Sequence, residues 1–347
     1  MAISAVSSYF YFKNNSSQAA ETDTAAAASA PVKTTSLEEL NLDDLKTLNV
    51  LLLGYGGAGH QGGYLSDVIQ VVSINFETGV VAMLSIPRDL WVKLPNNRQT
   101  KINQALTLGN DPNQPITSGA IAAKQMVKTV TGLDIDYFAA VDFVGFKRAI
   151  GVNLGGIEVD VPETLEDPWY PIDGEQLNPC GMTPDEIAEL TEQYSGFELE
   201  KQFPCRYEHL YFEQGVNHME GGAALKYVRS RHGSGAGDFS RSQRQHAVLM
   251  GIRDRIMEVE VWDDLPAFFA EVSDNVATDL DLEIVQYLAP ALKQAGNFET
   301  KTVIISTDNI LQAATSANGQ AILIPKQGMD QWDQVHQFVQ EQVGSEN

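Results

Sequence analysis

Apolar residues recur along this chain at two spacings, one typical of strands and the other of helices. Short leucine-rich or β-branched runs predict strands at residues 49–54, 68–75, 80–87, 137–141, 157–161, 302–306 and 320–325. Apolar positions three and four residues apart predict helices at residues 101–105, 117–130, 143–150, 248–256, 261–273, 282–294 and 329–343. This alternation predicts a layered α/β domain, and a hairpin formed by residues 68–75 and 80–87 makes its sheet mixed.

The predicted domain occupies residues 37–300, and residues 301–347 add strands and a helix that pack on it. Residues 163–212 break the alternation, because they are acidic and contain proline and aromatic residues, so they form an insertion over one edge. Cys180 and Cys205 both lie in this insertion. Two cysteines do not supply the ligands of a zinc site. A disulfide is expected if the chain lies outside the cytosol, and two free thiols are the alternative.

The N-terminal residues 1–36 differ in composition from the domain. Residues 1–12 are apolar but shorter than the ~20 residues that span a bilayer, and residues 14–36 are rich in Ser, Ala and Thr, as linkers are. We interpret residues 1–36 as a truncated membrane-anchor remnant and a disordered linker. A poor signal segment or a disordered tail fits the same composition.

The charge of the chain is uneven. A formal net charge of −23 argues against nucleic acid as the main partner. Residues 226–255 nevertheless hold seven of the 23 basic residues and only two acidic ones. A phosphate or pyrophosphate is the natural partner of clustered guanidinium groups, and a solvated basic face is the alternative.

The basic side chains of this stretch are expected to converge. Ser240 and Gln243 form a capping-box pattern, which predicts a helix start at Ser240. The free backbone N–H groups of the first helical turn favour binding of an anion. Three side chains near this turn share one helix face, namely Arg241, Arg244 and Gln245. Arg229 and Arg231 point the same way if their segment is extended.

A second candidate site lies at the open end of the predicted hairpin. Asp67 precedes its first strand, and Arg88 and Asp89 follow its second. Because hairpin strands are antiparallel, we expect Asp67 and Arg88 to lie close together, beside the glycine-rich loop of residues 55–63. The pair is either a structural salt bridge or part of a metal or phosphate site.

Six blocks of the sequence resemble motifs of the LytR-CpsA-Psr family, and they occur in the same order as in that family. They are Asn-Val-Leu-Leu-Leu-Gly at 49–54, Ser-Asp at 66–67, Leu-Ser-Ile-Pro-Arg-Asp at 84–89, Lys-Ile-Asn-Gln-Ala at 101–105, Tyr-Val-Arg-Ser-Arg at 227–231 and Asp-Phe-Ser-Arg-Ser-Gln-Arg-Gln at 238–245. The resemblance implies a three-layer α-β-α sandwich around a mixed central sheet, with a hydrophobic lipid channel. It also implies a phosphotransferase that is membrane-anchored on the outer face of the plasma membrane. Such an enzyme moves a glycopolymer from a polyprenyl-pyrophosphate carrier to peptidoglycan.

The resemblance implies roles for individual residues. Six would bind the pyrophosphate: Arg88, Lys101, Arg229, Arg231, Arg241 and Gln245. Asp67 would hold Mg²⁺ or Mn²⁺ between phosphate oxygens. Arg88 would also act in catalysis, and either Asp89 or Asp238 would orient groups or accept the proton of the attacking hydroxyl.

The chain departs from the family pattern at one metal position. A second aspartate usually follows the first strand, where this chain has Gly54-Tyr55-Gly56. A non-catalytic lipid- or polymer-binding module is an alternative, favoured if this departure abolishes metal binding. A polyprenyl-pyrophosphate hydrolase, which uses the same site with water as the acceptor, is another. Transcriptional regulation is disfavoured by the acidity and by the absence of a DNA-reading motif. The sequence does not predict the glycopolymer, the acceptor sugar or the oligomeric state.

Overall fold

The computed structural model describes residues 41–60, 62–94, 98–109, 111, 113–230, 237–258, 262, 264–273 and 275–344. These residues belong to one compact unit. Residues 1–36, which we interpret as an anchor remnant and linker, lie outside them. None of the described helices has both the length and the apolar character that a bilayer span needs.

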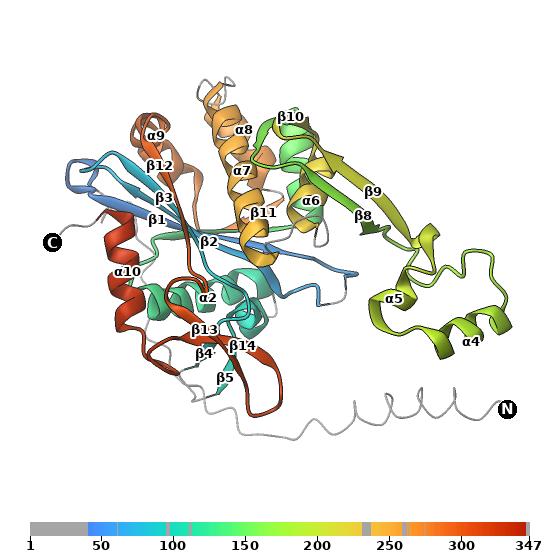
Figure 1. Cartoon of the computed structure of the whole chain (residues 1–347). Coiled ribbons are helices and arrows are strands. Elements are labelled where there is room, and N and C mark those ends of the chain that lie inside the picture. Colours follow the sequence, from blue (N-terminus) through green and yellow to red (C-terminus); the bar gives the residue numbers. More distant parts are fainter. Residues whose placement is uncertain are drawn as a thin grey trace. The chain divides into compact units, whose positions relative to one another are not determined.

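A mixed sheet of six strands forms the middle layer of the described part of the chain (Figure 1). In spatial order its strands are β11 (Val276–Thr278), β6 (Tyr137–Asp142), β1 (Thr47–Tyr55), β2 (Ser66–Asn75), β3 (Val80–Ser85) and β12 (Glu299–Ile304). β2 and β3 form the expected antiparallel hairpin, whereas β1 pairs with β6 and β3 with β12 in parallel. The predicted mixed sheet is confirmed.

Alternate residues of the strands face the two helical layers. Leu51, Leu53 and Ala82 pack in the core formed with α2 (Pro115–Thr131), α10 (Asp333–Val343) and the 3-10 helix η3 (Ile102–Leu108). Leu48 and Val81 face the other way, onto α9 (Leu282–Ala295). Figure 1 shows α2 and α10 on one side of the sheet and α9 on the other. The three-layer α-β-α sandwich is therefore confirmed.

A second apolar core lies under helices α6 (Gly221–Arg229) and α7 (Gly237–Glu258). It is built on the antiparallel pair β7 (Ile157–Val161) and β10 (Gly215–Met219), together with α3 (Phe143–Arg148), the π-helical turn η4 (Ala149–Asn153) and α8 (Leu265–Ser273). Helix α7 crosses β7 so closely that a Cβ on Gly251 would lie 2.4 Å from the carbonyl oxygen of Glu158. Glycine at this position therefore lets α7 reach the strand.

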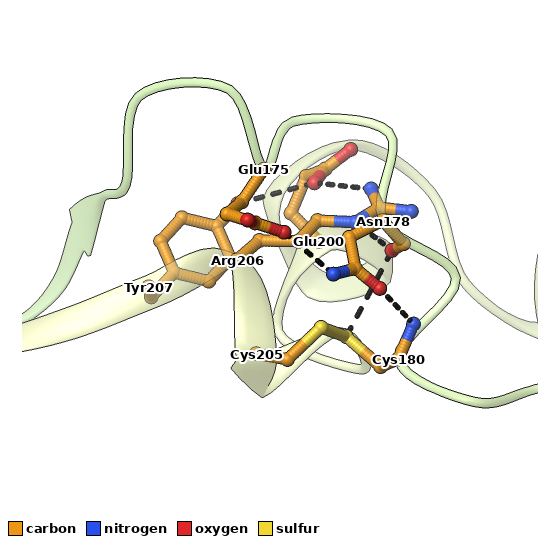
Figure 2. The surroundings of a disulfide bond; sticks show 7 residues. All are labelled: Glu175, Asn178, Cys180, Glu200, Cys205, Arg206 and Tyr207. Atoms are coloured by element: carbon orange, nitrogen blue, oxygen red, sulfur yellow. Dashed lines mark hydrogen bonds and ion pairs between the residues drawn. A yellow bond between two sulfur atoms is a disulfide. The ribbon is translucent and has the colours of Figure 1, made fainter.

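The insertion of residues 163–212 has its own scaffold. β8 (Leu165–Pro171) and β9 (Tyr207–Phe212) pair antiparallel and carry α4 (Pro184–Gln193), α5 (Gly196–Glu200) and the short 3-10 turn η5 (Pro204–Arg206). Cys180 and Cys205 form a disulfide with Cα atoms 5.6 Å apart, so the predicted bridge is confirmed (Figure 2). Beside it, Arg206 donates to the carbonyl of Asn178 at 2.8 Å and pairs with Glu200 at 3.1 Å.

The sequence pattern missed several three- to five-residue strands. These are β4 (Trp91–Lys93), β5 (Gln99–Lys101), β10, β11 and β13 (Leu311–Thr315), and the pattern does not predict the longer β8 and β9 of the insertion either; the strand expected at 320–325 is β14 (Ala321–Pro325). Strands this short show no periodicity. β11 forms because the distant β6 supplies its hydrogen-bond partners, whereas β4 pairs with the nearby β5 and β13 with the nearby β14. A 3-10 helix η2 (Leu42–Asp44) precedes β1.

Removal of the disulfide should destabilise the insertion. The bridge joins residues separated by 25 positions, and closing a loop of that size stabilises a fold by about 3 kcal/mol. We expect the double substitution Cys180→Ser and Cys205→Ser to lower the free energy of unfolding by about this amount, measured by urea denaturation. Unfolding at the same urea concentration in both proteins would contradict this, and finding two reactive thiols in the native protein would refute the bridge.

Candidate functional site

Asp67 joins two arginines from distant parts of the chain. Its carboxylate oxygen Oδ1 lies 2.7 Å from Nη1 of Arg88, and its backbone carbonyl accepts from Nη2 of Arg241 at 3.1 Å. The β2–β3 register, in which Gln70 faces Ser85, brings Asp67 opposite Arg88 when it is continued to the end of the hairpin. The predicted proximity of Asp67 and Arg88 is confirmed, although Asp67 lies inside β2 rather than before it.

Two cavities meet at this junction. The first, which we call the aromatic cavity, measures about 430 Å³ and extends over β1 and β6 toward the insertion. Its aromatic lining residues are Phe143, Phe146, Trp169, Tyr170, Phe197 and Tyr207. The second, the polar cavity, measures about 320 Å³ and is lined by Arg88, Ser242 and the turn after β12. The described lining residues common to both cavities are Asp67, Arg241 and Gln245.

Arg229 lies in the wall of the aromatic cavity. It is the last residue of α6, so the condition of an extended segment is not met at Arg229. Its guanidinium carbon lies 4.2 Å from the centre of the Phe143 ring, and Nη1 lies 3.5 Å from the hydroxyl oxygen of Tyr170. Burial raises the pKa of Tyr170, so this hydroxyl stays protonated beside the arginine.

Arg244 serves the fold instead of the cavities. It is 5% exposed and donates to the carbonyl oxygens of Tyr227 at 3.0 Å and Ser230 at 2.6 Å. Burial also lowers its pKa. The expected convergence of Arg244 with Arg241 and Gln245 is therefore wrong, although all three lie in α7, because the carbonyls of Tyr227 and Ser230 take the Arg244 guanidinium. The predicted helix start is also wrong: α7 begins at Gly237, and Ser240 is buried within it.

Asp89 and Lys101 form an ion pair beside the junction. Nζ of Lys101 lies 2.5 Å from one carboxylate oxygen of Asp89, and Nε of Arg88 lies 3.6 Å from the other. Neither residue is among the described lining residues of the two cavities. Arg231 and the side chain of Asp238 lie outside the described residues. The roles proposed for all these residues stay predictions.

A metal ion would find few protein ligands here. The described residues contain no group of three or more His, Cys, Asp or Glu side chains placed to hold one. Asp142 lines the aromatic cavity with Asp67, but its Oδ1 accepts from the N–H of Gly145 at 2.7 Å and caps α3. These residues therefore fit a cation only if phosphate and water oxygens complete its coordination, as Mg²⁺ commonly allows.

A series of buried hydrogen-bonding side chains, which the sequence pattern does not reveal, connects α7 to the sheet. Nε2 of Gln70 donates to the hydroxyl of Ser85 at 3.0 Å, and that hydroxyl lies 3.0 Å from Nε2 of His246. Burial lowers the pKa of His246 from 6.5 to about 4, so the ring is neutral at neutral pH. His246 is the neighbour of Gln245 in α7. The contact of His246 with Ser85 therefore helps to hold α7 in the orientation in which Arg241 and Gln245 line both cavities.

The fold and this site define a class of protein. The guanidinium groups of Arg229 and Arg241 lie in the lining of the aromatic cavity. This arrangement is suited to bind a ligand that has a phosphate or diphosphate group and a long apolar portion. The match to the LytR_cpsA_psr family model covers residues 8–331, and the chain belongs to this family. The expected resemblance is confirmed.

Named relatives and solved structures agree with this membership. The chain is 29% identical over 241 residues to the polyisoprenyl-teichoic acid–peptidoglycan teichoic acid transferase TagV of Bacillus subtilis, covering 68% of this chain and 50% of TagV. It is 24% identical to TagU of Enterococcus faecalis, a transferase of the same description, covering 72% of this chain and 67% of TagU. The chain thus spans about half the length of TagV.

The solved structures support the same fold. The crystal structure of B. subtilis TagV aligns with a TM-score of 0.58 and 24% identity, covering 87% of this chain and 99% of that one. A structure titled TagT bound to LIIa-WTA aligns with a TM-score of 0.58 and 20% identity, covering 91% of this chain and 98% of that one.

The buried His246 should make stability depend on pH. Its folded pKa lies below its unfolded value, so the unfolded state binds the proton first, and stability falls as the pH drops from about 6.5 to about 4. The substitution His246→Gln keeps a hydrogen-bonding side chain beside Ser85 but does not titrate. Between roughly pH 7 and pH 4, we expect the free energy of unfolding of this variant to fall by about 3 kcal/mol less than that of the unchanged protein. Urea unfolding of both proteins across this range measures the difference, and parallel pH profiles would refute it.

Proposed function

We propose that the protein transfers a glycopolymer from a polyprenyl-pyrophosphate carrier to peptidoglycan and forms a phosphodiester. The observation that carries the proposal is the junction at which Asp67, Arg241 and Gln245 line both an aromatic and a polar cavity. Transferase relatives whose names describe a polyisoprenyl-linked donor and a peptidoglycan acceptor support the proposal. An outer location on the plasma membrane, through an N-terminal anchor, belongs to the same proposal.

In this proposal the polyprenyl chain occupies the aromatic cavity, and the diphosphate lies at the junction. Arg229 and Arg241 bind the diphosphate from the α6–α7 side and Arg88 from the β3 side. Phosphoryl transfer depends chiefly on positioning and on neutralising the charge of the transferred group, so arginines that move little on binding can supply most of the rate enhancement. Gln245 supplies a neutral hydrogen-bonding group beside them.

Asp89 is better placed to position Arg88 than to accept a proton. Its carboxylate lies between Nζ of Lys101, at 2.5 Å from one oxygen, and Nε of Arg88, at 3.6 Å from the other, so both oxygens face cations of the protein. Lys101 acts through Asp89 in the same way. We therefore propose a positioning role for both, and keep Asp238 as the candidate base.

The arginines of the junction should be essential for transfer. Arg88→Ala or Arg241→Ala removes a cation that stabilises the transition state, so we expect the transfer rate to fall at least ~10²-fold. The measurement uses a labelled lipid-linked donor with and without peptidoglycan, which also separates transfer from hydrolysis by water. Arg148→Ala is the matched control, because Arg148 is exposed and is not a lining residue of either cavity. If Arg88→Ala or Arg241→Ala transfers the glycopolymer at the full rate, that arginine does not belong to the diphosphate site.

We further propose that Mg²⁺ or Mn²⁺ binds between Asp67 and the diphosphate. When bound, the ion would neutralise phosphate charge. We expect Asp67→Asn to weaken Mn²⁺ binding about tenfold in the presence of farnesyl diphosphate, measured by electron paramagnetic resonance, because the neutral amide is the poorer ligand. Asp173→Asn, an exposed carboxylate of the insertion, is the control and should leave the affinity unchanged. Equal affinities in all three proteins would exclude Asp67 as a ligand.

A further inference from the structure

The polar cavity has a wall that none of the predicted site residues provides. After β12 the chain turns through Ser306, Thr307 and Asp308, and all three residues line this cavity. The side chains of Thr307 and Asp308 are exposed. Arg88 lines the same cavity from the end of β3, so the turn and the arginine face one space.

Hydrogen bonds hold this turn in place. Oδ1 of Asn309 accepts from the N–H groups of Ser306 at 2.9 Å and Ile310 at 2.8 Å, and its Nδ2 donates to the carbonyl of Ile304 at 2.7 Å. The N–H of Asp308 donates to the hydroxyl of Ser306 at 3.2 Å. The turn therefore presents its side chains on a fixed frame.

The turn is also joined to the segment that carries Arg88. β12 pairs in parallel with β3, and the N–H of Ile305 donates to the carbonyl of Ser85 at 3.1 Å. From β14, Leu323 donates its N–H to the carbonyl of Asp89 at 3.0 Å. Ser306 to Asp308 thus line the polar cavity together with residues 86–88, and Asp67, Arg241 and Gln245 of the junction line it as well.

The two cavities lie on different sides of β2 along the sheet. The aromatic cavity extends over β1 and β6, where Gly54 and Val141 line it, and the polar cavity extends over β3 and β12, where Ser85 and Ile304 line it. In phosphoryl transfer the attacking and leaving oxygens lie roughly in line, on opposite sides of phosphorus. If the leaving polyprenyl phosphate occupies the aromatic cavity, the attacking hydroxyl must arrive through the polar one.

We propose that the polar cavity is the subsite for the acceptor sugar, with Thr307 and Asp308 as hydrogen-bonding partners of its hydroxyl groups. This inference rests on the proposed transfer function. Hydroxyl and carboxylate groups on a fixed turn suit a polyhydroxyl ligand, because a carboxylate accepts hydrogen bonds from several hydroxyls and threonine both donates and accepts.

Transfer to the acceptor exchanges one phosphorus–oxygen bond for another. The acceptor hydroxyl oxygen forms a bond to the sugar-linked phosphorus, and the bond from that phosphorus to the bridging oxygen of the diphosphate breaks. Polyprenyl phosphate leaves with the electron pair of that bond. The hydroxyl proton passes to the general base, for which Asp238 is the candidate, and from there to water, from which the departing phosphate is protonated. No oxidant or other reactant is required.

The test compares Asp308→Asn and Thr307→Ala with the unchanged protein, using a labelled lipid-linked donor and varied concentrations of a peptidoglycan glycan fragment. We expect the KM for the acceptor to rise about tenfold in Asp308→Asn and several-fold in Thr307→Ala, because charge-assisted hydrogen bonds are the stronger ones. The KM for the donor should not change. Glu299→Gln is the matched control, since Glu299 is exposed at the other end of β12 and should leave both constants unaltered.

Other outcomes separate this inference from the proposed function. If the KM for the acceptor is unchanged in Asp308→Asn, or the KM for the donor is raised, the polar cavity is not the acceptor subsite. Transfer by the unchanged protein in the same experiment still supports the proposed transferase function. If the unchanged protein transfers nothing, saturation-transfer NMR with the same glycan fragment still tests the subsite. Weaker fragment binding by Asp308→Asn then supports a sugar site without the transferase, and equal binding refutes it.

Discussion

The site depends on how an acidic protein keeps several guanidinium groups close together. Like charges repel, so each arginine needs a compensating contact that leaves part of it available to a ligand. Asp67 provides two of these contacts, with its carboxylate to Arg88 and its carbonyl oxygen to Arg241, from residues 21 and 174 positions away. The start of β2 is therefore where the hairpin and α7 become one site.

The corner between α6 and α7 supplies the other constraint. Arg244 binds the last carbonyls of α6, and Ser230, just beyond α6, donates to the buried carboxylate of Asp167 at 2.6 Å. Asp167 belongs to β8, so the same contacts attach the insertion to the corner. Arg229 on one helix and Arg241 on the other are thereby held at a fixed separation. A buried, fully bonded network of this kind specifies one arrangement more strongly than apolar packing does.

The sequence predicts those parts of the site that local rules determine. The hairpin places Asp67 near Arg88 because a short turn fixes its register, and the cysteine pair lies within one insertion. Helical spacing alone could not predict that Arg244 donates to carbonyls at the end of α6 while Arg241 donates to the carbonyl of Asp67 in β2. Periodicity shows which residues share a helix face, but not which elements pack against that face. Nor could it find the contact of Ser85 with His246, or that of Ser85 with Ile305, since both join residues more than 150 positions apart. Such pairings exist only once the layers have packed.

The division of the site between segments has a consequence for specificity. The cationic junction lies on β2, the end of β3 and α7, which belong to the packed core of the domain. The aromatic wall comes partly from the insertion, and the polar wall from the turn after β12. Trp169 contacts Phe197 and Tyr207 edge to face, and the disulfide lies two residues before Tyr207, so that wall is stabilised independently of the sheet. Changes in either wall can therefore alter which lipid or sugar is bound while the arginines keep their geometry.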